Sequence, residues 1–113
     1  MNPSLPFLKG TLDVLVLKAL LWSPMHGFEL TRWLTVRSGD AFALDEASIY
    51  QALYRLEGRG LIEAEWGLSD QGKRARYYKL TSSGRAQLKR QTAEWRSYAK
   101  VVASILDANP GTP

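Results

Sequence analysis

The sequence predicts an α+β fold that is mostly α-helical, with three helices before a β-hairpin and one long helix after it. Residues 46–59 place apolar side chains at i, i+3, i+4 and i+7, the spacing that buries one face of a helix. Residues 61–66 and 74–80 alternate on either side of a turn at 70–72, as the two strands of a hairpin do. Residues 82–106 repeat apolar side chains at three- and four-residue intervals, which predicts a helix of roughly 35–40 Å.

The composition bounds the class of protein. A chain of 113 residues, 45% of them hydrophobic, suits one folded domain with at most one appended element. The chain has no cysteine, which excludes disulfides and cysteine-based zinc sites. The longest apolar run, residues 14–22, contains Lys18 and is too short to span a bilayer, and residues 1–6 show no signal-peptide pattern. We therefore expect a cytoplasmic protein with no cofactor and no membrane partner.

Residues with capping side chains mark where the helices should begin. Thr11 is the expected N-cap of the first helix, because its hydroxyl can accept a hydrogen bond from an unpaired amide. Ser23 is expected to cap the second helix, with Pro24 in its first turn. Asp45 and Thr81 are expected to cap the third helix and the last one.

The face of the third predicted helix opposite its apolar stripe carries small or hydrogen-bonding side chains. Such groups can reach base edges and phosphates in a DNA groove. We expect DNA contacts from Ser48, Tyr50, Gln51, Tyr54 and Arg55. Tyr50 lies at the edge of the apolar stripe, so packing against the second helix and contact with a phosphate both remain open for it. Tyr54 faces outward more directly, although its ring is large for a base contact.

The predicted hairpin is strongly basic. Between residues 73 and 79 it has four cationic side chains and no acidic one, and the whole chain has a formal net charge of +4. Cationic groups beside a turn are suited to phosphate contacts, which we expect from Lys73, Arg74 and Arg76. The alternative is a solvated hairpin whose charge serves solubility. A helix with a contact-capable face followed by a basic hairpin is typical of a winged helix-turn-helix that binds DNA.

The last predicted helix has an apolar stripe and no further domain to bury it, so a second copy of the chain is its simplest partner. We expect residues 1–81 to form the winged-helix domain, and residues 82–113 to form a dimerisation helix with a frayed tail. Two reading helices per dimer imply a roughly palindromic DNA site. The expected interface residues are Leu88, Gln91, Trp95, Tyr98, Val102 and Ile105.

Several short motifs occur together and in order along the chain. They are KGTLD at residues 9–13, PMHGFEL at 24–30, SIY at 48–50, AL at 52–53, RLE at 55–57, GLI at 60–62, EWG at 65–67 and RARYYKLT at 74–81. With them the chain resembles the PadR family of bacterial transcriptional regulators from Leu8 to Leu106. The resemblance implies a dimeric winged-helix repressor that a small effector or a stress signal releases from DNA. The single C-terminal helix is similar to the compact branch of the family.

Two positions depart from the family pattern. Gln51 stands where many relatives have proline, and Phe28 stands where tyrosine is frequent. Because residue 51 is expected to face DNA, the operator sequence of a relative does not transfer to this chain.

The resemblance also points to Trp95. In some family members a tryptophan at the matching position lines a cavity in which flat aromatic compounds stack. Here Leu12, Val16, Tyr98 and Val102 would complete such a cavity, with Trp95 from two chains meeting across the two-fold axis. The alternative is that Trp95 is an interface anchor only, since aromatic side chains are enriched at such interfaces.

The remaining polar residues do not indicate an enzyme or a metal site. His26 is the only histidine and lacks neighbouring ligands, so we expect it to satisfy a helix-start group near Gly27. The acidic side chains, among them Glu63 and Glu65, have no nucleophile or histidine beside them for acid–base catalysis. Trp66 is expected to be buried at the base of the hairpin. The alternative function is a winged-helix protein-interaction module whose basic hairpin meets an acidic partner, without specific DNA binding.

Overall fold

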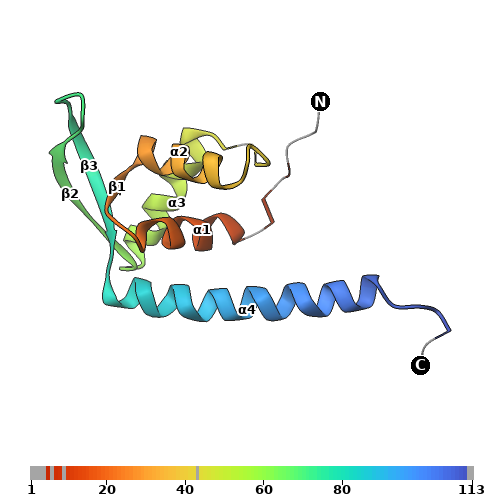
Figure 1. Ribbon diagram of the computed structural model, residues 1–113. Coiled ribbons are helices and arrows are strands. Elements are labelled where there is room, and N and C mark those ends of the chain that lie inside the picture. The colour runs from red at the N-terminus through yellow and green to blue at the C-terminus, as the bar shows by residue number, and fades with distance from the viewer. Residues whose placement is uncertain (1–4, 6, 9, 43, 112–113) are drawn as a thin grey trace.

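A helical layer, a small sheet beside it and one projecting helix make up the fold (Figure 1). The computed structural model describes residues 5, 7–8, 10–42 and 44–111. In chain order the elements are α1 (Thr11–Leu20), β1 (Met25–His26), α2 (Gly27–Arg37), α3 (Glu46–Gly58), β2 (Ile62–Leu68), β3 (Arg74–Leu80) and α4 (Ser82–Leu106). The predicted mostly helical α+β class is confirmed, and α4 ends at the predicted residue.

The sheet is antiparallel with strand order β1-β3-β2. Strands β2 and β3 pair in one continuous register from Ile62↔Leu80 to Leu68↔Arg74, and their turn is closed by Gly72, whose φ is +74°. That positive φ is why the turn contains a glycine. The two-residue strand β1, which the sequence analysis did not predict, pairs with the other edge of β3. The hairpin therefore has a third strand at its base.

The start of α1 differs from the expectation. Thr11 is the first residue of the helix, and its backbone amide donates to the carbonyl of Leu8 at 3.0 Å. The N-cap is Gly10, with φ at +83°, and it supplies no side-chain hydrogen bond. The left-handed turn at Gly10 directs the chain into the helix, so no threonine cap is formed.

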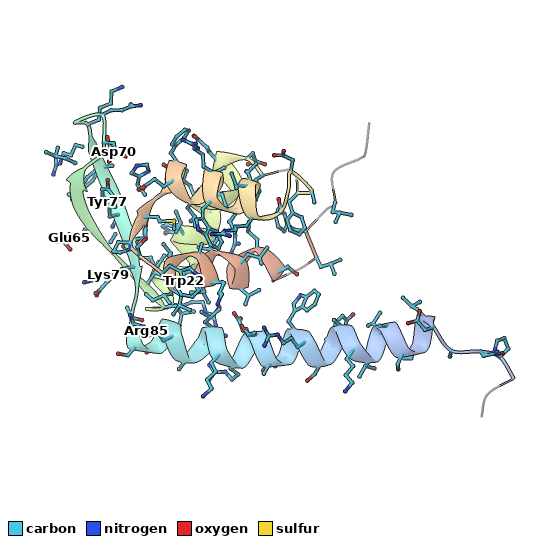
Figure 2. All side chains as sticks on the ribbon, in the orientation of Figure 1. Trp22, Glu65, Asp70, Tyr77, Lys79 and Arg85 are labelled. Carbon is cyan, nitrogen blue, oxygen red and sulfur yellow. The ribbon has the colours of Figure 1, made fainter. Side chains whose placement is uncertain are left out.

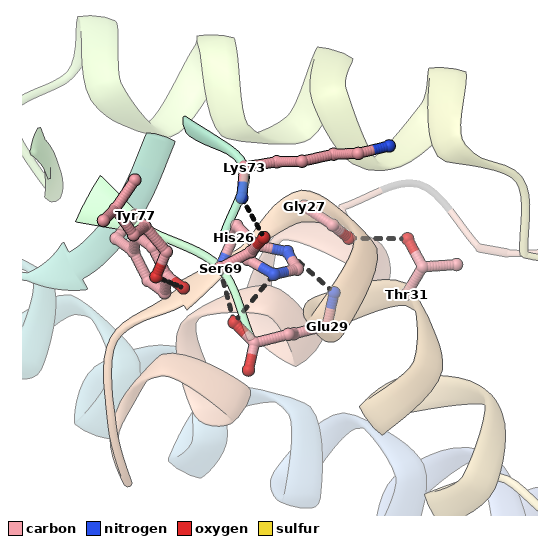
Figure 3. A network of polar contacts seen from close by, with 8 residues as sticks. His26, Gly27, Glu29, Thr31, Ser69, Lys73 and Tyr77 are labelled. Atoms are coloured by element: carbon pink, nitrogen blue, oxygen red, sulfur yellow. Dashed lines mark hydrogen bonds and ion pairs between the residues drawn. The ribbon is translucent and has the colours of Figure 1, made fainter. Parts of the chain in front are cut away.

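The start of α2 also differs, because Ser23 and Pro24 precede β1 and do not begin a helix. The N-cap is His26, whose Nδ1 accepts from the amide of Glu29 at 3.2 Å (Figure 3). The Glu29 carboxylate in turn accepts from the amide of His26 at 3.3 Å, which completes a capping box. The prediction that His26 satisfies a helix-start group is confirmed.

The other two predicted caps are confirmed. The Asp45 carboxylate accepts from the amide of Ser48 at 2.7 Å at the start of α3. The Thr81 hydroxyl accepts from the amide of Gly84 at 3.0 Å at the start of α4, and it also donates to the carbonyl of Gly60 at 2.7 Å. Thr81 therefore joins the start of α4 to the turn that follows α3.

The hydrophobic core lies around α1, which contacts α2, α3, α4 and β3. Leu88 of α4 is buried in this same core. Its side chain is therefore covered within its own chain, although it was expected on a surface between two copies. The fully buried large side chains are Val16, Leu17, Leu30, Ile49, Leu53, Leu56 and Ile62.

Gly84 allows α4 to run close to the chain that follows α3. A Cβ built on Gly84 would overlap the carbonyl oxygen of Leu61, which is backbone and cannot rotate away. We expect Gly84→Ala to lower the free energy of unfolding by about 1–3 kcal/mol, the usual cost of overpacking, as measured by urea denaturation.

The matched control is Gly58→Ala in the last turn of α3. Nothing lies within 4 Å of a Cβ built there, so alanine should raise the free energy of unfolding by about 0.5–1 kcal/mol through helix propensity. Equal stability of the two variants would contradict the close approach of α4.

Candidate nucleic-acid interface

The exposed face of α3 carries the side chains that the sequence analysis assigned to DNA. Tyr54 is 82% exposed, and Gln51 and Arg55 are exposed beside it. A shallow hollow of about 410 Å³ is lined by Tyr50, Gln51, Tyr54 and Arg55, so the helix brings these four together. Ser48 lies one turn earlier, half-buried, with its hydroxyl donating to the Asp45 carboxylate at 3.2 Å.

Arg55 already has an anionic partner in its own chain. Its guanidinium donates to the Asp13 carboxylate of α1 at 2.7 Å through Nη2 and at 3.5 Å through Nε. The hydrogen bond to Asp13 raises the pKa of Arg55 above its usual value, which keeps the guanidinium charged. This pair fixes α3 to the first turn of α1, and a phosphate reaching Arg55 would have to share it with Asp13.

Tyr50 packs on α2 and is exposed at the same time. Its ring lies over Gly27, where a Cβ would come within 2.6 Å of both Cζ and Oη, and 48% of the residue remains exposed. Partial burial, with a smaller contribution from the Glu46 carboxylate, raises the pKa of Tyr50, so the hydroxyl remains protonated and can donate. The two interpretations of Tyr50 are therefore compatible in one geometry.

The cationic residues of the wing, residues 62–80, differ in their contacts. Lys73 follows the turn, and its backbone amide donates to the Ser69 hydroxyl at 3.2 Å (Figure 3). Arg74 lies over the indole of Trp66 at 4.5 Å from the ring centroid. Arg76 donates to the Glu57 carboxylate of α3 at 2.8 Å, which ties β3 to α3.

Trp66 is 58% exposed, which corrects the expectation that it is buried at the base of the hairpin. Strand alternation places it on the same face as Ile62, which is buried, and Ala64, which is half-buried. The helices cover only the base of that face, so Trp66 lies beyond the core although it points to the same side. Its partner is Arg74 rather than the core.

A separate apolar cavity of about 830 Å³ lies between α1 and α4. Trp95 lines this cavity within one chain, and Leu12, Val16, Tyr98 and Val102, which were expected to complete a cavity at the two-fold axis, are not among its lining residues. Val16 is fully buried in the core, Leu12 packs against the core, and Tyr98 and Val102 lie further along α4. On α1 the lining residues are Thr11, Val14, Leu15 and Lys18, which follow the 3–4 spacing of a second helix face.

The C-terminal half of α4 extends past the rest of the molecule (Figure 2). Of the residues expected at a dimer interface, Trp95, Tyr98 and Ile105 are exposed large side chains. Val102 is half-buried, and the Oε1 atom of Gln91 is buried with no hydrogen-bond partner among the described residues. This half of α4 therefore presents an apolar face to solvent.

Three packed helices followed by a basic β-hairpin define a winged helix-turn-helix protein. Residues 16–90 match the Transcriptional regulator PadR-like family, and the chain belongs to this family. The function class that follows is DNA-binding regulation of transcription, and the similar solved structures are regulators rather than enzymes.

Relatives match over most of their length. An uncharacterized protein of Lysinibacillus sphaericus is 34% identical over 101 residues, 88% of this chain and 92% of that one. A PadR family transcription regulator of hypervirulent Clostridium difficile is 33% identical, with a TM-score of 0.74 over 86% of this chain and 99% of that one. A PadR-like transcriptional regulator of Bacillus cereus is 28% identical, with a TM-score of 0.77 over 89% and 96%.

Two further findings concern residues 5, 7–8, 10–42 and 44–111 only. None of their helices has the length and hydropathy needed to cross a membrane. These residues contain no cluster of three or more His, Asp or Glu side chains that could hold a metal ion.

Gly27 should control the position of Tyr50. We expect Gly27→Ala to push the ring aside and lower the free energy of unfolding, because the new methyl group overlaps Cζ and Oη. In a Tyr50→Ala background the same change should cost nothing, giving a coupling energy of about 0.5–3 kcal/mol in a double-mutant cycle by chemical denaturation. Additive effects of the two substitutions would contradict the contact.

Proposed function

We propose that the protein is a homodimeric repressor that binds a roughly palindromic operator through α3 and the wing, and that a small effector or a stress signal releases it. The observation that carries this proposal is a shared surface: Tyr50 of α3 lines the same cleft as Arg74 and Arg76 of the wing. Exposed hydrogen-bonding groups on a helix beside wing cations match what base readout and phosphate positioning require.

The dimer in this proposal forms through α4, residues 82–106. Its exposed apolar side chains Trp95, Tyr98 and Ile105 need a partner surface, and a second copy supplies one by two-fold symmetry. The two copies of α3 would then reach half-sites about 34–36 Å apart, one helical turn of DNA.

The effector in this proposal is a flat aromatic compound that enters the cavity between α1 and α4. Trp95 offers a ring for stacking, and Val14, Leu15 and Leu21 supply an apolar wall. Because α4 would hold the partner and α1 packs on α3 through the shared core, with the Asp13–Arg55 pair beside it, a ligand between α1 and α4 would change the separation of the two α3 helices.

The first test is a DNA titration at several salt concentrations, with a duplex from upstream of the protein's own gene and a random duplex. Arg74→Ala should weaken binding to both duplexes and flatten the dependence of log K on log salt by about one, because one phosphate contact is lost. Gln51→Ala should instead change the preference between sequences. Lys79→Ala is the control, since Lys79 pairs with Glu63 on the opposite face of the hairpin.

The upstream duplex should bind well above the random one. Equal affinity for both would refute the repressor and favour an interaction module that meets an acidic protein. A monomer at micromolar concentration, both alone and with the upstream duplex, would refute the dimer.

Trp95 should report the effector. We expect planar aromatic compounds to quench tryptophan fluorescence in the wild type and in Trp66→Phe, whose ring lies outside the cavity. Quenching should be lost in Trp95→Ala because the stacking partner is gone. Undiminished quenching in Trp95→Ala would remove that residue from the effector site and leave it as an interface anchor.

A further inference from the structure

A second cleft, of about 640 Å³, lies between the wing and α2 and reaches α3. It borders the exposed face of α3 at Tyr50 and the wing turn at Gln71. In Figure 2 the wing turn, labelled at Asp70, stands beyond the N-terminal end of α2. No DNA contact was expected from the α2 side of this cleft.

The two walls of the cleft carry the same arrangement of side chains. On α2, the guanidinium of Arg32 lies 6.0 Å from the ring centroid of Phe28, which is exposed. On the wing, the guanidinium of Arg74 lies 4.5 Å from the ring centroid of Trp66, which is exposed as well. Each wall therefore presents a large ring together with a guanidinium held against its face.

Stacking leaves the hydrogen-bonding edge of a guanidinium free. Neither Arg32 nor Arg74 forms an ion pair with any residue in the described part of the chain, whereas Arg76 is bound to Glu57. The cleft also holds two carboxylates, Glu29 and Asp70. Glu29 is engaged in the capping box of α2 and pairs with neither arginine. The two stacked arginines can therefore donate hydrogen bonds to a new anion.

The position of the cleft selects its occupant. A duplex that receives α3 in one groove and the wing in the next must pass one sugar–phosphate strand between them. We infer that this cleft seats that strand, with phosphates held by Arg32 and Arg74 and deoxyribose rings against Phe28 and Trp66. This inference rests on the proposed function, and it assigns Arg32, Phe28 and Trp66 to the DNA interface.

The test uses the salt dependence of binding by the full-length protein to the upstream and random duplexes. Arg32→Ala should lower the affinity for both duplexes by the same factor. It should also make the negative slope of log K against log salt shallower by about 0.9, because one phosphate contact is lost. Arg32→Lys should keep the wild-type slope while binding more weakly, because lysine retains the charge and loses the planar fork.

Arg37→Ala is the matched control. Arg37 lies on the same helix, stacked on Trp33 at 5.2 Å, but outside the cleft. Arg37→Ala changes the net charge by the same amount as Arg32→Ala. Because Arg37 lies outside the cleft, the slope for this variant should stay at the wild-type value. Trp66→Leu tests the rings separately: affinity should fall while the slope is unchanged, because no charge is removed. Thermal unfolding of each variant verifies that the fold is retained.

The outcomes separate the inference from the proposed function. If the wild type prefers the upstream duplex but Arg32→Ala and Arg37→Ala share the wild-type slope, the cleft does not hold a strand and the inference is wrong. If Arg32→Ala makes the slope shallower but the wild type binds both duplexes equally, the cleft holds a strand and sequence-specific repression is wrong.

Discussion

Burial of α1 is the constraint on which the rest of the structure depends. Val16 and Leu17 are fully enclosed, and α1 contacts α2, α3, α4 and β3, so each functional surface is positioned against this one helix. The α3 surface is fixed to it by the Asp13–Arg55 pair, and α4 faces it across the apolar cavity. Because close-packed interiors transmit strain, a change in packing on one side of α1 shifts the elements that pack on its other side.

The arginines of the interface divide by what they already contact. Arg55 and Arg76 are bound to carboxylates, and each joins two elements: α3 to α1, and the wing to α3. Arg32 and Arg74 lie on aromatic rings with no carboxylate partner among the described residues, whereas Arg76 has both its carboxylate and the ring of Tyr78 at 5.7 Å. In the proposed interface, the first pair would maintain the shape of the surface, and the second pair would meet phosphates without giving up an anionic partner. Net charge alone does not make this distinction.

The sequence predicted the fold well where a periodic pattern and burial agree. Apolar spacing located α3 and α4, and alternation with a glycine turn located the hairpin, because these patterns are direct consequences of one-sided burial. It failed at Trp66, since alternation gives the face of a strand but not how far the core extends along it. It also did not distinguish the two apolar faces of α1, of which packing encloses the one with Val16 and leaves the other beside the cavity. The strand β1 has two residues, too few for any pattern.

That two-residue strand supports the wing on its second edge. Met25 and His26 pair with Tyr78 and Tyr77. Strand β3 is therefore hydrogen-bonded on both edges in its middle and on one edge only toward the turn. The hairpin is therefore supported next to the α2 cap, and Arg76 ties β3 to α3 beyond the β1 pairing, while Arg74 and Trp66 lie toward the turn. In the proposed complex, a wing supported in this way would reach a DNA groove already aligned, so that fewer residues would lose conformational freedom on binding.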